Sequence, residues 1–549
     1  MIDAIREAGK RYGELAKTVA STGMIRPTSP AVLWELQRAL RKYGPTQPAG
    51  YAISAARLPD EPAIIDELGM LTNREVHERT NQLAHGLIAA GLGNGSRIAI
   101  LCRNHRGFIE AFTAALKIGA DGLLLNTAFA GPQLVQVIED QNADAVIMDE
   151  EYVELLHDAL DGRPAFIGWH DTEKPALPTL DDVRRGQSIL EPGEPGRAGR
   201  TIILTSGTTG KPKGAARAEP KGLMGLLSVV ATIPYRYRAR MLVCAPLFHA
   251  WGFANFSANL TFNGTAILRR RFDPEDVLAT IEREQADMMV VVPVMLQRLL
   301  DLPDEVKRKY NVSSLRAVAA SGSALPGQLA TEFMDEFGDV LYNLYGSTEV
   351  AWATVAAPAD MRAAPGTAGK APTGTELRIL DENRHEVPQG QTGQIFVKHD
   401  MIFEGYTGGE EKNSHADMVG TGDVGHLDSE GRLFIDGRVD DMIISGGENV
   451  YPVEVEDVLA KHAEVYETAV VGIEDAEFGA RLRAFVVRKG DSAIGEEELK
   501  IYVKTHLANF KVPREIIFLD ELPRNATGKV LKRDLREYDA EPANVEPGE

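Results

Sequence analysis

A ten-residue segment, 205–214, combines glycines, hydroxyl groups and lysines as polyphosphate-binding loops do. It reads Thr-Ser-Gly-Thr-Thr-Gly-Lys-Pro-Lys-Gly and follows the apolar run 202–204. Glycine lets the backbone approach an anion closely. Hydroxyl and amide groups donate hydrogen bonds to the anion, and lysine supplies positive charge. We therefore predict a nucleotide polyphosphate site formed by Thr205, Ser206, Gly207, Thr208, Thr209, Gly210, Lys211 and Lys213.

The loop is not a Walker A motif, because neither of its lysines is followed by Ser or Thr. The alternative is an ordinary surface turn, in which Gly, Ser and Thr are common. The density of glycines, hydroxyls and lysines within ten residues favours the phosphate site.

A second polar group, Tyr345-Gly346-Ser347-Thr348-Glu349, follows the apolar segment 340–344. Ligands of parallel α/β sheets bind at the carboxyl ends of strands, so this group and the phosphate loop are expected to face one site. There Glu349 offers a hard oxygen ligand for Mg²⁺, and Thr348 offers a phosphate donor. Tyr345 could stack on a nucleotide base. The alternative for Glu349 is a solvated loop carboxylate.

Three further motifs give weaker indications. In Gly420-Thr-Gly-Asp423, a carboxylate beside glycines could accept hydrogen bonds from a ribose diol, although Gly-Asp pairs also form common turns. The glycine-containing polar segment 437–449 suits a hinge between domains. Lys529 stands on a glycine-containing loop and could reach an anion, whereas in isolation it would be taken for a surface lysine.

The elements that must position these motifs alternate between strands and helices, which predicts parallel sheets with helices on their faces. The expected helices are 76–92, 108–118, 274–285 and 293–301, and the expected strands are 97–102, 145–148, 202–205, 241–245, 265–269, 288–292, 315–320 and 340–344. Shorter strands follow at 376–380, 394–398 and 432–435, and a compact α+β segment after residue 438 has strands at 468–473, 483–488 and 515–519 and a helix at 496–508. The predicted fold class is α/β, with a large N-terminal body of stacked α/β subdomains plus a β-rich subdomain and a small mobile α+β C-terminal domain.

Length and composition predict several domains rather than one. For the 549 residues we expect an N-terminal extension at 1–45, a large domain at 46–437 and a small C-terminal domain at 438–549. The net charge of −21 argues against a dedicated nucleic-acid-binding protein. Two cysteines without metal-ligand spacing, no signal peptide and no 18-residue apolar run predict a cytoplasmic protein without a membrane span.

The extension at 1–45 is basic in an otherwise acidic chain, with eight Lys and Arg against four Asp and Glu. Apolar residues within 31–43 recur at helical spacing, opposite a basic face. This helix is expected either to lie on a membrane surface or to pack on the body with its basic side in solvent. We predict that the extension assists peripheral contact with a lipid surface or formation of a homodimer.

Taken together, the motifs resemble the adenylate-forming superfamily of acyl-CoA synthetases, 4-coumarate–CoA ligases, luciferases and peptide-synthetase adenylation domains. The resemblance covers about residues 50–535 and rests on the joint occurrence of the motifs in the superfamily's order. Gly405-Tyr406 and the segments 421–425 and 446–451 look most like those of a bacterial fatty-acid–CoA ligase.

The resemblance implies a role for each motif. Segment 205–214 matches the loop that binds the β- and γ-phosphates of ATP, and Ser323 and Ala324 match the segment that lines the adenine. Tyr345, next to Gly346, matches the residue stacked on adenine. The remaining matches are Thr348 to the α-phosphate contact, Glu349 to the Mg²⁺ ligand, Asp423 to the ribose-diol carboxylate, Arg438 to the nucleotide-binding arginine, Asp440 to the hinge, Gly446 and Gly447 to the pantetheine entry loop, and Lys529 to the adenylation lysine.

His249 follows an apolar strand, close to Trp251 and Phe253. The resemblance implies that His249 lines the acyl end of the site and that the two aromatic residues wall or gate the acyl pocket. The alternatives are a structural histidine and plain core aromatics.

The implied activity is that of an AMP-forming acid–thiol ligase that uses ATP, Mg²⁺ and CoA. A carboxylate would attack the α-phosphorus of ATP to give acyl-AMP and pyrophosphate, and CoA would then displace AMP. Mg²⁺ and Lys529 would neutralise the charge that develops. A fatty acid is the expected substrate. The alternatives are an aryl-CoA ligase, an acyl-AMP ligase that serves a carrier protein, and a non-catalytic nucleotide sensor, against which Glu349 and Lys529 argue.

Overall fold

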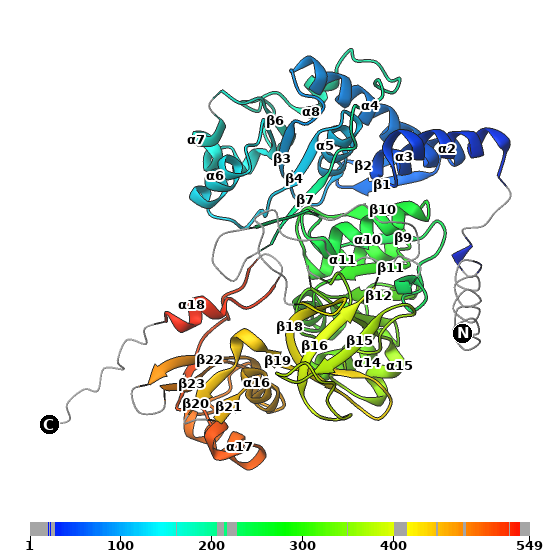
Figure 1. Cartoon of the computed structure of the whole chain (residues 1–549). Coiled ribbons are helices and arrows are strands. Elements are labelled where there is room, and N and C mark those ends of the chain that lie inside the picture. The colour runs from blue at the N-terminus through cyan, green and yellow to red at the C-terminus, as the bar shows by residue number, and fades with distance from the viewer. Residues whose placement is uncertain are drawn as a thin grey trace.

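The computed structural model describes residues 20, 22–23, 28–160, 162–205, 213–216, 228–347, 350–399, 414–445, 448–475, 479–525 and 528–538. The strands within these ranges form four sheets, A to D. Sheets A and B belong to the upper and middle parts of the molecule in Figure 1, and sheet D belongs to the small domain at the lower left. The expected mixed α/β fold, with a large N-terminal body and a smaller C-terminal domain, is confirmed.

Sheet A supplies the strand ends that precede His249, Ser323 and the segment after Leu344. Its described strands stand in the order β14-β13-β12-β11-β9-β10-β1-β2, and only the edge pairs β1–β2 and β13–β14 are antiparallel. The bounds are β1 (Pro62–Asp66), β2 (Gly69–Thr72), β9 (Arg240–Val243), β10 (Thr265–Leu268), β11 (Met288–Val291), β12 (Ala317–Ala320), β13 (Leu341–Tyr345) and β14 (Thr354–Ala356).

Sheet B carries the predicted phosphate loop at one edge. The described order is β6-β5-β3-β4-β7-β8, parallel except for the last pair. The bounds are β3 (Arg97–Leu101), β4 (Asp121–Leu124), β5 (Ala145–Asp149), β6 (Ala165–Trp169), β7 (Thr201–Thr205) and β8 (Lys213–Ala216). Because β7 and β8 pair antiparallel, the backbones of Thr205 and Lys213 lie opposite each other where the loop begins and ends.

Helix α5 (Arg106–Lys117) forms a layer shared by sheets A and B. It contacts β1 of sheet A and β3 and β4 of sheet B, and every one of its residues is buried. Its Phe, Ile, Leu and Ala residues pack into the core, and its buried charged residues are paired. Arg106 binds Asp66, Glu110 binds Arg79, and Lys117 donates to Thr80 and Asn81. The sequence therefore forms one continuous core between the two sheets.

The remaining helices of the large domain cover the sheets and connect their strands. They are α4 (Asn73–Ala89), α6 (Gly131–Asp140), α7 (His157–Leu160), α8 (Leu180–Arg184), α10 (Ala250–Thr261), α11 (Pro274–Glu284), α12 (Pro293–Leu300), α13 (Asp304–Lys307), α14 (Gly327–Phe337) and α15 (Pro358–Ala363). Local signals fix several of their ends. Thr72 and Glu75 form a reciprocal capping box at the start of α4, and Asp273 caps α11 ahead of a proline.

Sheets C and D complete the fold. Sheet C is antiparallel and contains β15 (Glu376–Leu380), β16 (Gly393–Lys398), β17 (Ser414–His415), β18 (Met418–Leu427) and β19 (Leu433–Arg438). Sheet D contains β20 (Ile443–Ser445), β21 (Glu448–Val450), β22 (Val465–Asp475), β23 (Gly479–Arg488) and β24 (Glu515–Phe518). The helices of the same domain are α16 (Pro452–Ala460), α17 (Glu496–His506) and α18 (Lys532–Arg536). The predicted hinge residue Asp440 lies in the short 3₁₀ turn Val439–Asp441 between these two sheets.

The N-terminal extension contributes α2 (Pro30–Tyr43), followed by α3 (Gln47–Arg57). The helix packs on the body, but the expectation that its basic side faces solvent is wrong for Arg38 and Lys42. Both side chains bind Glu191, at 2.7 and 2.9 Å. The apolar side chains are the exposed ones: Leu33, Trp34, Leu36 and Leu40 are 54, 64, 38 and 40% exposed. No helix in the described ranges is long and apolar enough to span a bilayer.

Candidate active site

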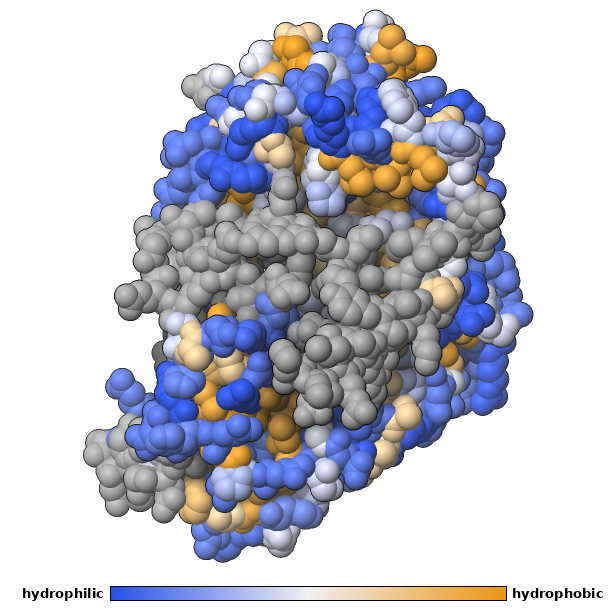
Figure 2. Space-filling model, turned by 45° about the vertical axis from the view of Figure 1, so that its right-hand side comes forward, coloured by the Kyte–Doolittle hydropathy of each residue, from blue (hydrophilic) through white to orange (hydrophobic). Residues whose placement is uncertain are grey.

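A cleft of about 2350 Å³ follows the carboxyl ends of the strands of sheet A and continues between the large domain and the C-terminal domain. Segments that follow β9, β11, β12 and β13 line it on one side, and residues of β18, β19, α16 and α18 line it on the other. In Figure 2, the coloured part of the surface is largely hydrophilic, with separate apolar groups. Motifs that lie far apart in sequence therefore meet in one cavity.

Tyr345, Asp423 and Arg438 form a polar group at one end of the cleft. The Tyr345 hydroxyl donates to Asp423 Oδ2 at 2.5 Å, and burial together with this carboxylate raises the pKa of Tyr345 well above its ordinary value. Asp423 and Arg438 are direct cross-strand partners on β18 and β19, and their side chains approach to 3.9 Å. The group presents a carboxylate and a guanidinium, which suit a ribose diol and a phosphate.

Ser323, Ala324 and Gly346 lie on the same part of the cleft wall. The first two stand in the connection from β12 to α14, and Gly346 follows β13 directly. A Cβ atom at Gly346 would lie 2.3 Å from the carbonyl oxygen of Ala351, so this close approach of two backbone segments requires glycine.

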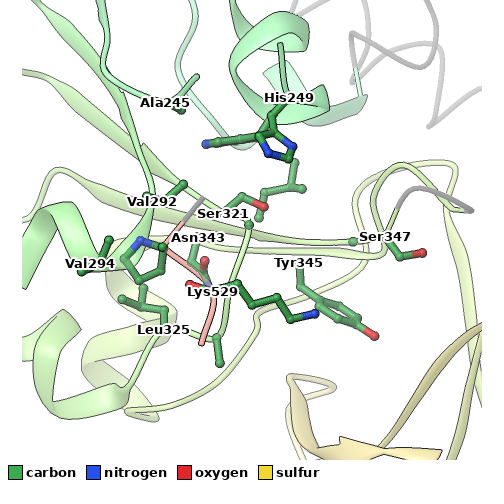
Figure 3. Close-up of a pocket in the computed structure, with 18 of the residues that line it drawn as sticks. Ala245, His249, Val292, Val294, Ser321, Leu325, Asn343, Tyr345, Ser347 and Lys529 are labelled. Carbon is green, nitrogen blue, oxygen red and sulfur yellow. The ribbon is translucent and has the colours of Figure 1, made fainter. Parts of the chain in front are cut away.

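Lys529 enters the cleft from the C-terminal domain. Its backbone N–H donates to Asn525 Oδ1 at 3.0 Å, and its carbonyl accepts from Asn525 N at 2.9 Å. The side chain is exposed to the cleft and extends toward Tyr345 (Figure 3). Crowding by protein atoms, and then the Arg438 guanidinium, lowers the pKa of Lys529. The Lys529 ammonium thus lies where it would form an ion pair with an anion bound between the two domains.

His249 stands on the opposite side of the cavity, at the N-terminus of α10 (Figure 3). Burial lowers its pKa to about 4, so the ring is neutral at neutral pH. Trp251 and Phe253 also line the cleft. The Trp251 indole N–H donates to the carbonyl of Val291 at 2.9 Å, and Phe253 packs edge-on against Phe112 of the core.

Four polar atoms that line the cleft are buried without a hydrogen-bond partner within the described ranges. They are His249 Nε2, Asn343 Oδ1, Ser347 Oγ and, on β22, Thr468 Oγ1. A buried polar atom without a partner costs about 1–3 kcal/mol, so these atoms are places where a polar group of a ligand or a water molecule would bind favourably. Ala245, Val292, Val294 and Leu325 form apolar parts of the same cavity wall (Figure 3).

One buried cluster has the side chains of a metal site, but its histidine is engaged in hydrogen bonds. Within the described part of the chain, Cys102, His105 and Asp149 are the side chains close enough together to share an ion. Both ring nitrogens of His105 are already used, because Nε2 bonds Asp149 at 2.7 Å and Nδ1 accepts from the N–H of Gly107 at 3.0 Å. The cluster instead braces the start of α5.

Comparison with known proteins agrees with this site. The model of the AMP-binding enzyme family matches residues 51–407, and that of the AMP-binding enzyme C-terminal domain matches residues 454–529. The chain belongs to the AMP-binding enzyme family. It is thus a member of the adenylate-forming superfamily, as the order of its motifs indicated.

Several members of the AMP-binding enzyme family are similar over most of this chain. A feruloyl-CoA synthase of Amycolatopsis sp is 34% identical over 477 residues, which cover 85% of this chain and 93% of that protein. An indoleacetate–CoA ligase of Aromatoleum aromaticum is 32% identical over 500 residues, which cover 88% and 94%. The structure of an o-succinylbenzoate CoA synthetase from Bacillus subtilis, in complex with its acyl-adenylate intermediate, matches with a TM-score of 0.77 and 28% identity over 91% of this chain and 99% of that one.

Some predicted site residues lie outside the described residues of this AMP-binding enzyme, so their roles stay predictions from sequence. They are Ser206, Gly207, Thr208, Thr209, Gly210, Lys211, Thr348, Glu349, Gly446 and Gly447. For Thr205 and Lys213 the structure describes the backbone alone.

Sequence reasoning missed Asn343, and it placed Ser347 within the predicted group 345–349 without giving it a role of its own. Both flank Tyr345 at a spacing of two residues, and alternate residues of a strand lie on one face. That periodicity places Asn343 beside Tyr345 on the cleft face of β13, so the signal was present. The apolar walls formed by Val292, Val294 and Leu325 carry no comparable signal, because a buried valine or leucine is ordinary core composition.

Proposed function

We propose that this protein is an AMP-forming acid–CoA ligase whose substrate is an aromatic carboxylic acid. The observation that carries the proposal is the position of Lys529. It extends from the small domain into the same cleft that Asp423 and Arg438 line at one end and His249 lines at another. That arrangement suits a reaction in which a nucleotide phosphate and a carboxylate meet beside a cation.

In the first half-reaction, the acid carboxylate attacks the α-phosphorus of ATP and pyrophosphate leaves. Asp423 would accept the ribose hydroxyls, and Tyr345 would flank the base. Lys529 would neutralise charge on the carboxylate and α-phosphate, a contribution that typically amounts to several kcal/mol of barrier. Glu349 would hold the Mg²⁺ that accompanies ATP, and Thr348 would contact the α-phosphate. Segment 205–214 would hold the leaving pyrophosphate.

In the second half-reaction, the CoA thiol displaces AMP from the acyl-adenylate to form the thioester. The thiol would need to reach the acyl carbon through the cleft that Lys529 enters. Rotation of the C-terminal domain about Asp440 would withdraw the lysine and bring the segment of Gly446 and Gly447 to the site. The position of Asp440 in a short turn between sheets C and D supports this role.

The cavity favours an aromatic acid over a fatty acid. Its walls are apolar, yet Asn343 and His249 each contribute a buried polar atom without a protein partner. An alkyl chain would leave those atoms unsatisfied, whereas an aromatic acid with hydroxyl, keto or N–H groups could pair with them. The similar proteins named above are a feruloyl-CoA synthase, an indoleacetate–CoA ligase and an o-succinylbenzoate CoA synthetase, and these names agree with the aryl alternative better than with the fatty-acid expectation.

A pyrophosphate-release screen with ATP, Mg²⁺ and CoA tests the proposal across cinnamic, benzoic, arylacetic and linear alkanoic acids. We expect release with at least one aromatic acid, and a catalytic efficiency for it that is higher than for any alkanoic acid. Activity restricted to alkanoic acids would contradict the aryl assignment. Adenylate without thioester would favour the acyl-AMP ligase that serves a carrier protein.

Replacing Lys529 by alanine separates the two half-reactions. We expect Lys529→Ala to lower acid-dependent ATP–pyrophosphate exchange by about 10²–10³-fold, as removal of one transition-state donor typically does. Thioester formation from supplied acyl-AMP and CoA should be largely spared, because that step proceeds with the lysine withdrawn. Equal loss of both half-reactions would show that the role of Lys529 is wrong.

The extension retains two proposed partners, a lipid surface and a second copy of the chain. The exposed leucines Leu33, Leu36 and Leu40 are the residues on α2 that either partner would contact. Leu36→Glu combined with Leu40→Glu should abolish liposome co-sedimentation or shift the solution mass to that of a monomer. Both proposals would be contradicted if the wild-type protein does not sediment with liposomes and has the mass of a monomer in solution.

A further inference from the structure

The C-terminal domain contacts helix α12 at both ends of that helix. At its N-terminal end, Gly528 lies so close to Val294 that a Cβ on the glycine would be 2.4 Å from Val294 Cγ1. At its C-terminal end, the Tyr466 hydroxyl donates to Oδ2 of Asp301, the C-cap residue of α12, at 2.5 Å. We call these two contacts the α12 interface.

The α12 interface is joined to the loop of Lys529 through two consecutive residues of β22. Glu467 forms an ion pair with Arg524 at 2.7 Å, and Arg524 donates to the carbonyl oxygen of Gly528 at 2.6 Å. Tyr466, the neighbour of Glu467, contacts α12 itself. The tyrosine therefore fixes β22 against the large domain, and the glutamate fixes the lysine loop against β22.

Both partners of the Tyr466–Asp301 bond suit this task. Burial and the Asp301 carboxylate raise the pKa of Tyr466, so its hydroxyl remains a donor. The second carboxylate oxygen of Asp301 accepts from Gln297 Nε2 at 3.0 Å, one turn earlier in α12. The acceptor is thus held in place by the helix that it caps.

The other end of the interface borders the substrate cavity. Val292 and Val294, at the start of α12, line the cleft and flank the point where Lys529 enters (Figure 3). Gly528 has φ +78°, and its close approach to Val294 leaves no room for a side chain. A bound acid that displaced Val294 would therefore also displace the loop that carries Lys529.

We propose that α12 is the docking element that holds the C-terminal domain in the adenylation position, with Tyr466 and Gly528 as positioning residues for Lys529. The inference rests on the proposed function, since it assigns Lys529 to the first half-reaction. The domain must leave α12 before CoA attacks, so the interface serves one half-reaction and opposes the other.

Tyr466→Phe and Asp301→Ala test the hydrogen bond. The bond is solvent-accessible, so we expect each variant to slow ATP–pyrophosphate exchange by about threefold to tenfold, the range for one modest hydrogen bond. Thioester formation from supplied acyl-AMP should be unchanged or faster. The double variant should be no slower than either single variant, because both remove one interaction. Asp301→Asn retains an acceptor and should keep most of the exchange rate.

Tyr310→Phe is the matched control. Tyr310 also donates to a carboxylate, Glu275 at 2.7 Å, but both residues belong to the large domain. Its half-reactions should equal those of the wild type. An exchange rate unchanged by Tyr466→Phe, or an equal loss of both half-reactions, would overturn the proposal.

Gly528→Ala tests the packing contact independently. The added methyl group cannot fit against Val294, so exchange should fall by more than in Tyr466→Phe. Val294→Ala in the same chain removes the clashing Cγ atoms and should restore part of the exchange rate. No restoration would show that the loss arises from backbone strain at the left-handed φ rather than from docking.

A structural readout separates failure of the interface from failure of the proposed function. Dyes on Arg308→Cys and Ile501→Cys, in a chain with Cys102 and Cys244 replaced by alanine, report the distance between the two domains by energy transfer. Tyr466→Phe should broaden or shift that distance even if no tested acid is activated. An unchanged distance would contradict the docking role, whereas an inactive wild type with a shifted distance would contradict only the ligase assignment.

Discussion

At the scale of single residues, the site combines side chains that were predicted from the sequence with side chains that were not. Tyr345, Asp423, Arg438 and Lys529 were each predicted, and the structure brings them to one cleft. Asn343 was not predicted, although it stands two residues before Tyr345. Its importance depends on an unpaired buried oxygen, which is a property of the folded cavity and not of the residue type.

Asn343 is expected to recognise a hydrogen-bond donor on the aromatic acid. Asn343→Leu keeps the approximate size of the side chain but removes the acceptor. The catalytic efficiency for a hydroxylated cinnamic acid should fall about tenfold relative to cinnamic acid itself, because one hydrogen bond is worth about 1.4 kcal/mol. The measurement is kcat/KM for the two acids with both enzymes. Equal losses for the two acids would exclude this role.

At the scale of elements, hydrophobic periodicity predicted the type and place of most strands and helices that carry motifs. It did not predict β4, whose four residues are all buried and show no alternation. The segment around Asp423 was weighed against a common turn, yet it lies within the ten-residue strand β18. The segment is a strand because it pairs with the neighbouring strand β19, which places Arg438 opposite Asp423. Pairing between distant segments is set by tertiary packing, which local pattern does not report.

Helix α2 shows how a partner remote in sequence can reverse an expectation about an amphipathic helix. Its basic face was expected in solvent, but Glu191, about 150 positions away, binds Arg38 and Lys42. Burial alone would raise the pKa of Glu191, yet hydrogen bonds from these two cations lower it to about 2. The carboxylate is therefore ionised throughout the useful pH range and holds the helix on the body.

Removing that carboxylate should release α2. Glu191→Ala removes the carboxylate that Arg38 and Lys42 share, and leaves Arg38 its pair with Glu35 and Lys42 its bond to the carbonyl of Pro192. The loss of hydrogen bonds to a charged group typically costs about 1.5–3 kcal/mol. We expect trypsin to cleave within α2 at least about tenfold faster than in the wild type, while pyrophosphate exchange persists. Asp60→Ala is the matched control, because its pair with Arg74 is exposed on both sides and contributes little. Equal cleavage rates in the two variants would contradict the assignment.

At the scale of the whole molecule, two half-buried histidines link stability to pH. Burial lowers the pKa of His249 to about 4, and burial together with Lys117 lowers that of His77 to about 3. An unfolded histidine titrates near 6.5. Above pH 6.5 both imidazole rings are neutral in the folded and in the unfolded chain, so they do not change the free energy of unfolding. As pH falls below 6.5, the two imidazoles bind protons in the unfolded chain but stay neutral in the folded chain. The free energy of unfolding therefore decreases.

The loss should reach about 2 kcal/mol per histidine at pH 5, at about 1.36 kcal/mol for each pH unit below 6.5. Thermal unfolding midpoints should therefore fall between pH 7 and pH 5, a window that lies above the titration of most carboxylates. In the double variant His77→Gln, His249→Gln neither side chain titrates, so the decline should be distinctly shallower than in the wild type. Parallel profiles for the two proteins would show that these histidines do not govern the acid side of the stability curve. A shallower profile would show that the burial of the two histidines together lowers the free energy of unfolding at acid pH, and the single variant His249→Gln would give the share that comes from the histidine beside the substrate cavity.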